Sequence, residues 1–338
     1  MTYRWRLRTW AGLMAVMLLW IAGCGGTNAG SGSSAPSEKP PVATVAAPPA
    51  ESPSGSGAEP MEDPAAVRIF TDAIDRQVEV PVKPERIVSL EFTGYLHALG
   101  VKPVATSPRF FLPPFAEFME GAEDLGYPAN LEKLAGIEPD LIIAPDYVTQ
   151  DQMDAFEKIA PVVLLKWSET NNLNRLTMLA DLLDRHDEER QWLDSYKRLA
   201  EQTREKLRDY VKPGESAAVF YAWSTSINVL APQVISTLYD DIGFEPTEKM
   251  KQRLAAEPDF ASETISKELL SDYAADRMFF IAEGELGKEL LADLKKNVLS
   301  TVPAFREDKV YVLDPNWYSF EPTLLEWQLN NAVEVLAE

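Results

Sequence analysis

Aromatic side chains and one arginine concentrate in short segments that each follow a run of apolar residues. Trp and Tyr rings offer a large apolar contact area, stack on flat organic groups and carry hydrogen-bond donors. Such segments predict non-covalent binding of an organic ligand. For any single ring, packing inside its own sheet is an equally good interpretation. The candidate ligand contacts are Arg109, Tyr147, Lys166, Trp167, Tyr221, Trp223, Trp317 and Tyr318.

Arg109 has the most specific setting of these candidates. It lies between Pro108 and Phe110, and an apolar surrounding strengthens a charged contact. We therefore expect its guanidinium group to contact the ligand. The alternative is a surface ion pair with Glu117 or Glu120, which would contribute little free energy.

Sequence patterns for catalysis or metal binding are missing. We find no Gly-x-Ser-x-Gly elbow, no Ser/His/Asp order and no glycine loop that cradles phosphate. Of the two histidines, His97 lies in a helical pattern and His186 in an acidic stretch, and the single Cys excludes a disulfide framework or an iron–sulfur cluster. We predict a binding protein that is not an enzyme and has no cofactor or resident metal.

The charge balance narrows the class of partner. Lys and Arg number 32 against 53 Asp and Glu, which gives a net charge of -21. Phosphate binding relies on clustered cations, so a polyanionic chain is repelled from nucleic acid. We exclude nucleic acid as a partner.

The elements that must position the candidate residues alternate between short apolar runs and helical periodicity, which is typical of α/β architecture. Helices are predicted over 93–99 and 151–159, with Gly100 and Pro161 as stop signals. The candidate residues then fall at the carboxyl ends of strands, where α/β sheets bind their ligands. The predicted strands cover residues 86–91, 103–107, 140–145, 161–167, 217–223, 277–283 and 309–314.

One long amphipathic helix is predicted over residues 188–211. Apolar and aromatic residues recur there at three- and four-residue steps, with no internal Gly or Pro. A new strand-rich block follows Pro213 and Gly214. We expect this connecting helix to join an N-terminal α/β lobe at residues 67–187 to a C-terminal α/β lobe at residues 212–338.

The first residues have the pattern of a targeting segment. A cationic start precedes an apolar stretch too short to span a bilayer, which predicts a signal peptide over residues 1–23. Its end, Ile21-Ala22-Gly23-Cys24, resembles the lipobox of bacterial lipoproteins, in which the Cys is acylated and becomes the mature N-terminus. The alternative is an ordinary signal peptide with an incidental Cys. Cleavage removes three Arg and no acid, which takes the net charge from -21 to -24.

A tether is predicted over residues 24–66. Thirty of the 42 positions from Gly25 to Ala66 are Gly, Ser, Pro or Ala, and none is aromatic. Such a segment buries too little apolar surface to offset its ordering entropy. We therefore expect a disordered tether between an acylated Cys24 and the two lobes.

Four segments of the first lobe resemble one group of ABC-importer substrate-binding proteins, those that carry ferric siderophores, vitamin B12 and haem. The resemblance extends to the end of the chain, through residues 309–312 and the pair Trp317 and Tyr318, and is weak over residues 240–268. The four segments are 86–90 (RIVSL), 96–105 (LHALGVKPVA), 125–134 (LGYPANLEKL) and 137–143 (IEPDLII).

This resemblance implies two α/β lobes joined by one stiff helix, with the ligand in the cleft between them. It implies a monomer anchored by lipid on the extracytoplasmic face of the cell membrane, which hands its ligand to an ABC permease and its ATPase. By the same resemblance Arg109 lies where siderophore binders place an Arg on the oxygen atoms of the ferric chelate.

The family also docks acidic residues of each lobe onto basic pockets of the permease. Glu117 or Glu120 fits that role in the first lobe, and Asp240, Asp241 or Glu245 fits it in the second. Plain surface acids are an equally good interpretation of all five.

Charge favours one class of ligand. A ferric tris-catecholate carries three negative charges and needs a cluster of cations, whereas only Arg109 and Lys166 are well placed. A ferric tris-hydroxamate is neutral or slightly cationic, so we expect a hydroxamate siderophore. The alternatives are a cobalamin or haem receptor, and a surface sensor or adhesion protein without transport.

Overall fold

The computed structural model describes residues 66–167, 172–223, 226–297 and 302–337. All described residues belong to one compact unit of the chain. The predicted signal peptide, Cys24 and all of the tether but its last residue lie outside the described residues.

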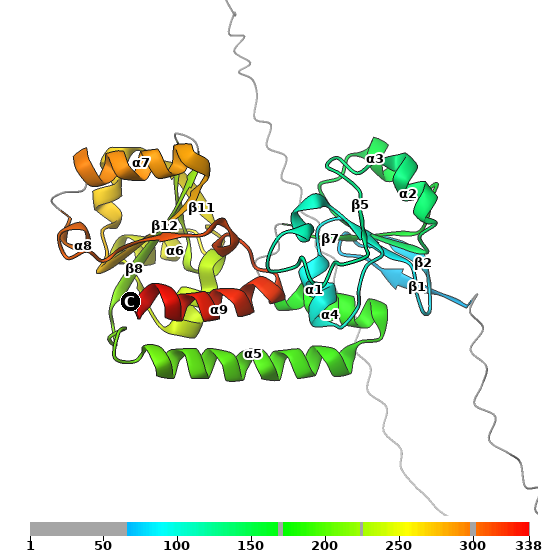
Figure 1. Ribbon diagram of the computed structural model, residues 1–338, viewed down its shortest axis with the longest axis horizontal. Coiled ribbons are helices and arrows are strands. Elements are labelled where there is room, and N and C mark those ends of the chain that lie inside the picture. The colour runs from blue at the N-terminus through cyan, green and yellow to red at the C-terminus, as the bar shows by residue number, and fades with distance from the viewer. Residues whose placement is uncertain (1–65, 168–171, 224–225, 298–301, 338) are drawn as a thin grey trace, which may run out of the picture. The chain divides into compact units, whose positions relative to one another are not determined.

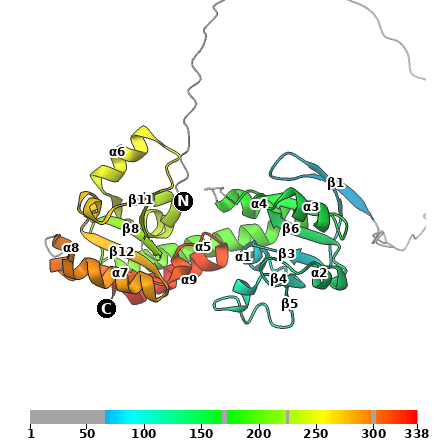
Figure 2. The same ribbon diagram turned by 90° about the horizontal axis from the view of Figure 1, so that it is seen from above.

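Two α/β lobes make up the described part of the chain, each built round its own sheet (Figures 1 and 2). The N-terminal lobe has a five-stranded parallel sheet in the order β5-β4-β3-β6-β7. Every residue of β3, β6 and β7 is buried, as expected for a parallel sheet covered on both faces. The strands are β3 (Ile87–Ser89), β4 (Ala105–Thr106), β5 (Glu123–Asp124), β6 (Leu141–Pro145) and β7 (Val162–Leu165).

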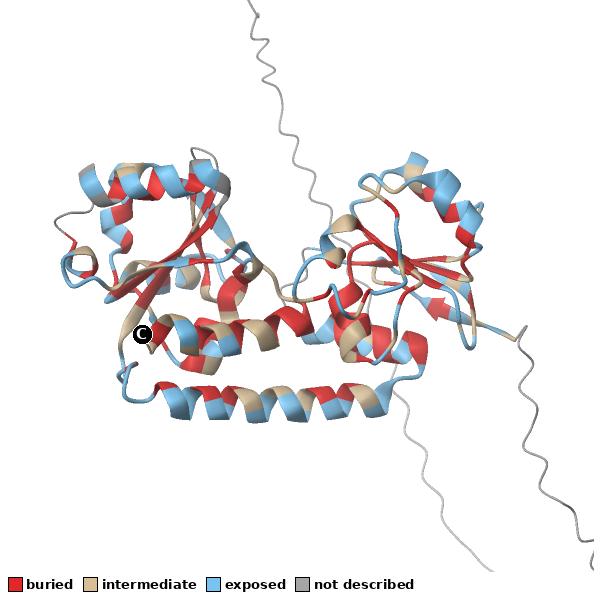
Figure 3. Ribbon diagram, viewed as in Figure 1, coloured by how far each residue is buried: buried red, intermediate tan, exposed pale blue. Residues whose placement is uncertain are grey.

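Helices cover both faces of this sheet. Alternate residues of β6 divide between them, since Ile143 packs on one face and Ile142 on the other. Helices α1 (Thr93–Ala98) and α4 (Asn172–Leu183) bury the face of Ile143, and α2 (Leu131–Ile137) and α3 (Gln150–Phe156) bury the face of Ile142. Figure 3 shows the resulting buried layer along the strands.

An antiparallel hairpin that the sequence analysis does not predict precedes this sheet. It consists of β1 (Val67–Thr71) and β2 (Gln77–Pro81), which pair along their whole length. Phe70 and Val80 are its buried residues, and they pack into the same core cluster as α1 and α4. The hairpin therefore completes the hydrophobic core on that face of the lobe.

The C-terminal lobe has a six-stranded mixed sheet in the order β11-β9-β8-β12-β13, with β10 beside β8. Strand β9 runs antiparallel to both β8 and β11, and the other pairings are parallel. Strands β8, β12 and β13 coincide with predicted strands, whereas the other three, of two to five residues each, are not predicted. The strands are β8 (Ser216–Trp223), β9 (Ser226–Leu230), β10 (Glu245–Pro246), β11 (Ser262–Ile265), β12 (Arg277–Glu283) and β13 (Val310–Leu313).

Helix α5 (His186–Leu207) follows the N-terminal lobe and leads into the C-terminal lobe. It buries a stripe that includes Trp192, Ala200 and Thr203, which agrees with the predicted amphipathic pattern. It ends four residues before the predicted limit, because the amides of residues 210 and 211 both bond to the carbonyl oxygen of Leu207 and close the last turn. Three acidic residues in its first turn suit the helix dipole.

The remaining helices are α6 (Glu248–Ala256), α7 (Gly284–Asn297), α8 (Pro303–Arg306) and α9 (Pro322–Leu336). Helix α9 packs against α5 and also against α1 of the N-terminal lobe. The last helix of the chain thus contacts its first helix. Among the residues that the structure describes, no helix has the length and apolar character needed to cross a membrane.

Candidate ligand-binding site

The strand order of the N-terminal sheet reverses between β3 and β6. The chain runs from β3 to β4 and β5 on one side, and returns to β6 and β7 on the other. Open α/β sheets bind ligands at such a switch point, outside the carboxyl ends of the strands. An open pocket lies there, which we call the switch pocket. Its lining residues are Glu91, Ser107, Pro108, Arg109, Tyr127, Tyr147 and Trp167.

Arg109 is held between two carboxylates at this pocket. It lies in a short 3₁₀ helix, η1 (Pro108–Phe111), directly after β4. Its Nε is 3.0 Å from Oε2 of Glu91, and its Nη2 is 2.6 Å from Oε1 of Glu321. The Arg109 side chain is 40% exposed, whereas those of Glu91 and Glu321 are 9% and 6% exposed. We call these three residues the Arg109 clamp, and the surface ion pair considered as an alternative is not formed.

The rest of the Arg109 guanidinium group faces aromatic rings and the backbone. Its carbon atom lies 4.2 Å from the ring centroid of Phe110 and 5.9 Å from that of Trp167. Nη2 also donates to the carbonyl oxygen of Glu91 at 3.0 Å. Within the described residues no acceptor bonds to Nη1. The clamp therefore fixes one edge of the group and leaves N–H bonds for a ligand.

Glu321 reaches the clamp from the far end of the chain, directly before α9. Its Oε2 accepts a hydrogen bond from the backbone N–H of Gly94 at 2.7 Å, in the first turn of α1. A carboxylate there satisfies a free N–H and meets the positive end of the helix dipole. A Cβ on Gly94 would lie 2.6 Å from Oε2, so the contact requires glycine. Burial raises the pKa of Glu321, and the neighbouring Arg109 opposes that rise.

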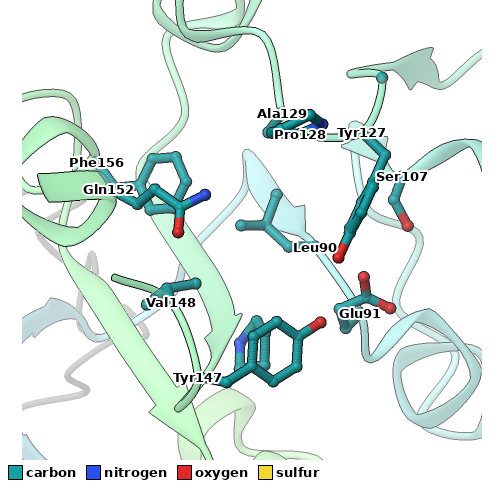
Figure 4. Close-up of a pocket in the computed structure, with 12 residues that line it drawn as sticks. Leu90, Glu91, Ser107, Tyr127, Pro128, Ala129, Tyr147, Val148, Gln152 and Phe156 are labelled. Atoms are coloured by element: carbon teal, nitrogen blue, oxygen red, sulfur yellow. The ribbon is translucent and has the colours of Figure 1, made fainter. Parts of the chain in front are cut away.

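Glu91 and two tyrosines form a second polar group in the pocket. Burial raises the pKa of Glu91, while Arg109 and a hydrogen bond from the Tyr147 hydroxyl lower it. Burial and the nearby Glu91 raise the pKa of Tyr147, whose hydroxyl also hydrogen-bonds with that of Tyr127. Figure 4 shows both hydroxyl groups directed toward the Glu91 carboxyl group. The Tyr147 phenol is therefore a neutral donor at physiological pH.

Trp167 forms an aromatic wall of the pocket together with Tyr147. Their rings meet edge to face at 5.7 Å between centroids, and both side chains are about half exposed. The backbone of Trp167 is fixed from two sides, because its N–H donates to Asp146 at 2.9 Å and its carbonyl accepts from Nη2 of Arg175 at 3.0 Å. The Lys166 side chain is exposed and does not line the pocket.

The predicted residues of the C-terminal lobe fall into two groups. The rings of Tyr221 and Tyr318 stack at 4.6 Å between centroids, and Trp223 at the end of β8 is 60% exposed. The prediction that Trp317 contacts the ligand is wrong, since this side chain is only 1% exposed and lies in the core of its lobe. Its Nε1 donates to Asn331 at 2.8 Å. A ring enclosed in this way does not offer a face to a ligand.

Four of the five candidate docking acids are exposed, namely Glu117, Glu120, Asp240 and Glu245. Asp241 is half-buried and accepts a hydrogen bond from the Tyr196 hydroxyl. Glu245 also forms an ion pair with Lys251 at 2.8 Å. Exposure is compatible with docking and with plain surface acids alike.

His97 takes part in helix packing. Its Nδ1 lies 2.9 Å from Oγ1 of Thr323 in α9, its ring is 4.1 Å from that of Phe118, and burial lowers its pKa. Within the described ranges, no three His, Cys, Asp or Glu side chains gather in a way that could hold a metal ion. The switch pocket therefore offers a guanidinium group, phenol donors and aromatic faces to a ligand.

The sequence of the two lobes matches a known protein family. The family model described as "Periplasmic binding protein" matches residues 125–317. That range begins directly after β5 and ends shortly before α9. It includes Tyr127, Tyr147 and Trp167 of the switch pocket.

Similar proteins span most of the chain. The iron(3+)-hydroxamate-binding protein YxeB of Bacillus subtilis is 22% identical over 335 residues, covering 96% of this chain and 95% of its own length. The iron(3+)-hydroxamate-binding protein FhuD of the same organism is 27% identical over 273 residues, covering 77% of this chain and 84% of its own length.

A solved structure has the same fold. It is a periplasmic binding protein component of a Fep/Fec-like ferrichrome ABC transporter from Bacillus subtilis, with a TM-score of 0.70. The match covers 80% of this chain and all of that chain, at 24% sequence identity. At this identity the likeness concerns the fold, two α/β lobes in each protein.

Proposed function

The chain belongs to the periplasmic binding protein family, and on that premise we propose that it binds a ferric siderophore of the hydroxamate type for an ABC transporter. The observation that carries the proposal is the Arg109 clamp beside the aromatic wall of Trp167 and Tyr147. Two relatives that span most of the chain bear the name of iron(3+)-hydroxamate-binding proteins. Iron arrives here as part of the chelate, so the protein needs no metal ligands of its own.

The charges of the clamp favour a ligand without a large negative charge. The pocket lining contains one guanidinium group and one carboxylate, and a second carboxylate contacts Arg109 from behind. The charge of Arg109 is thus already balanced by Glu91 and Glu321. A tris-catecholate would bring three more negative charges to this site, whereas a tris-hydroxamate is neutral or slightly cationic.

The remaining groups suit the surface of such a chelate. Carbonyl and hydroxamate oxygens accept hydrogen bonds, and Arg109 offers N–H donors in a rigid fork. The Tyr127 and Tyr147 hydroxyl groups lie near the same carboxylate and can donate hydrogen bonds. Trp167 offers apolar contact to the organic backbone of the chelate.

A titration tests the proposal. Purified protein is titrated with ferrioxamine B, ferrichrome and a ferric tris-catecholate while Trp fluorescence is recorded. We expect saturable quenching by the two hydroxamates and at least tenfold weaker binding of the catecholate. Haem and cobalamin serve as further ligands in the same assay. If none of the iron chelates gives a saturable response, the siderophore function is ruled out.

The membrane anchor is the second part of the proposal. Acylation at Cys24 would keep the binding lobes on the extracytoplasmic face of the membrane, since each buried methylene contributes about 0.8 kcal/mol. Incorporation of labelled palmitate into the wild-type chain but not into a Cys24→Ala variant is the expected result. A variant that stays in the membrane fraction would contradict the anchor.

Delivery to a permease is the third part. The exposed acids Glu117, Glu120, Asp240 and Glu245 are the candidate docking residues, one pair in each lobe. Charge reversal of one acid per lobe should abolish uptake of the ferric ligand by cells and leave its binding to the purified protein unchanged. Charge reversal of Glu188, an exposed acid at the start of α5, is the matched control.

A further inference from the structure

A second cavity adjoins the switch pocket and extends into the N-terminal lobe. We call it the recess, and its volume is about 110 Å³. It shares Glu91, Ser107, Tyr127 and Tyr147 with the switch pocket, so the two cavities meet at these residues. The rest of its lining consists of Leu90, Gly126, Pro128, Ala129, Pro145, Val148, Gln152 and Phe156.

The far end of the recess is apolar. Leu90 and Phe156 belong to the core cluster between the sheet and helices α2 and α3, and Val148 and Ala129 pack against that cluster. Figure 4 shows Leu90 at the centre of the recess, with Phe156 and the Gln152 amide on one side of it and Tyr127, Ser107 and Glu91 on the other. An apolar group that enters here is removed from water by side chains of the lobe core.

One polar group of the shared wall lacks a partner. Ser107 is 5% exposed, and its Oγ has no hydrogen-bond partner among the described residues. Leaving a buried hydroxyl unsatisfied is unfavourable, so such a group in a native protein calls for an explanation. Tyr127 lines the same wall and is 74% exposed, so its ring is not enclosed by the core of the lobe. A ligand atom that enters past Tyr127 supplies the missing hydrogen bond.

We propose that the recess is a subsite for a short alkyl or acyl appendage of the ligand, anchored at its mouth by a hydrogen bond to Ser107. The inference rests on the proposed function and narrows the class of chelate that it accepts. An apolar cavity of roughly 150 Å³ holds one benzene ring. The recess is smaller, so it accepts a chain of a few carbon atoms and excludes a ring or a long acyl chain.

An acyl series tests this subsite on the full-length protein. The probes are ferrioxamine B derivatives whose terminal amine carries an acetyl, butanoyl or decanoyl group, because all three amides have the same charge. Each buried methylene should raise affinity roughly fourfold. Full burial of two more methylenes would give roughly sixteenfold, and because the recess opens into the switch pocket we expect the butanoyl derivative to bind about tenfold more tightly than the acetyl derivative. The decanoyl derivative should bind no more tightly than the butanoyl derivative.

Variants that fill the recess provide the structural test. Val148→Phe and Ala129→Leu add carbon atoms from two different walls, so one of them suffices if the other fails to fold. Either variant should reduce the butanoyl preference to less than twofold, while affinity for the acetyl derivative stays within threefold. The matched control is Val82→Phe, an exposed site after β2 that does not line the recess, which should retain the tenfold preference.

Ser107→Ala separates ligand anchoring from a structural role. Removing a buried hydroxyl without a partner should raise the melting temperature, since no hydrogen bond is lost in the free protein. Affinity for all three derivatives should fall about threefold or more. A variant that gains stability and keeps full affinity would contradict the anchoring role.

The outcomes distinguish the subsite from the proposed function. Equal affinity for the acetyl and butanoyl derivatives, or a preference that survives in both filled variants, overturns the subsite while leaving siderophore binding intact. If no ferric complex binds, the proposed function fails. The recess is then tested with iron-free butanohydroxamic and acetohydroxamic acids by NMR. Binding of the butano acid to the wild type but not to the filled variants upholds the subsite, and absence of binding overturns it.

Discussion

The two lobes offer different chemistry at the carboxyl ends of their strands. The N-terminal lobe has a pocket in which Glu91, Arg109 and Glu321 are joined by ion pairs beside Trp167. The C-terminal lobe offers aromatic faces, the stacked pair of Tyr221 and Tyr318 and the exposed ring of Trp223. From this difference we predict that the first lobe orients a ligand and the second adds contact area.

Burial explains why the lobes divide in this way. A charged group can point at a ligand with a fixed geometry only if partners hold it, and the clamp provides two buried carboxylates for one guanidinium group. Aromatic rings need no such partners, because they have few rotatable bonds and are amphipathic. Substitutions in each lobe test this division.

The first prediction contrasts two tryptophans of the C-terminal lobe. Trp317→Ala removes a buried core ring and should lower the free energy of unfolding by about 3–5 kcal/mol. Trp223→Ala removes a ring that is 60% exposed and should change stability by less than about 0.5 kcal/mol, while weakening ferrioxamine B about tenfold. Urea unfolding and fluorescence titration measure the two effects. Unchanged affinity of the Trp223 variant would remove the C-terminal lobe from the binding surface.

The second prediction removes the charge that joins the clamp. Arg109→Ala leaves two buried carboxylates unpaired, which should lower the free energy of unfolding at pH 7 by about 2–4 kcal/mol and affinity by more than tenfold. The lower end is expected, because Arg109 is partly exposed and solvent screens its contacts. Arg185→Ala breaks an exposed pair with Glu188 and is the control. Equal losses in both variants would refute an orienting role for the clamp.

The third prediction replaces Gly94, which should displace the Glu321 end of the clamp. Gly94→Ala places a Cβ 2.6 Å from Oε2 of Glu321, and the clash should cost about 1–3 kcal/mol and weaken the ligand. Gly136→Ala is the matched control, because it lies in α2 with no atom near its Cβ position. Alanine there should stabilise the helix by about 0.5–1 kcal/mol. A Gly94 variant that behaves like the control would show that Glu321 does not need its hydrogen bond to the first turn of α1.

The fourth prediction is a pH dependence. Burial raises the pKa of Glu321, so its contribution to folding is fully present below the ordinary value of 4.5 and is lost as pH rises through the raised pKa. Glu321→Gln does not titrate and keeps an oxygen for the Gly94 N–H. The free energy of unfolding of the variant should equal that of the wild type near pH 4 and exceed it increasingly toward pH 7.

The control for the pH series is Glu188→Gln. Glu188 is exposed, and hydrogen bonds from backbone and Arg185 lower its pKa, which is the opposite direction. Urea unfolding between pH 4 and 7 should therefore give no growing advantage for this variant. An advantage of Glu321→Gln that shrinks toward neutral pH would contradict the burial argument.

Local patterns account for most of what the sequence predicts correctly. The buried apolar runs of β3, β6, β8 and β12 reveal the central strands of the two sheets, and the amphipathic stripe of α5 reveals the connecting helix. Three of the predicted contacts, Arg109, Tyr147 and Trp167, line one pocket because loops after parallel strands meet at one edge. Whether these three contact a ligand stays a prediction.

Long-range contacts account for what the sequence does not predict. Glu321 and Gly94 are 227 positions apart, and no local pattern connects them. In the sequence, Glu321 and Pro322 indicate only that a helix starts there. Trp317 is predicted wrongly because the short helix η5 (Pro315–Trp317), begun by an Asp314 cap, turns its ring into the core instead of outward.

The hydrogen bond between Glu321 and α1 has a consequence for the order in which the clamp forms during synthesis. Residues 91, 94 and 109 leave the ribosome long before residue 321 does, because synthesis begins at the N-terminus. Until the last helix arrives, Arg109 has one carboxylate partner and the first turn of α1 keeps an open N–H. A chain that stops short of residue 321 would lack the second carboxylate of the clamp. The finished geometry of the clamp therefore depends on complete synthesis of the chain.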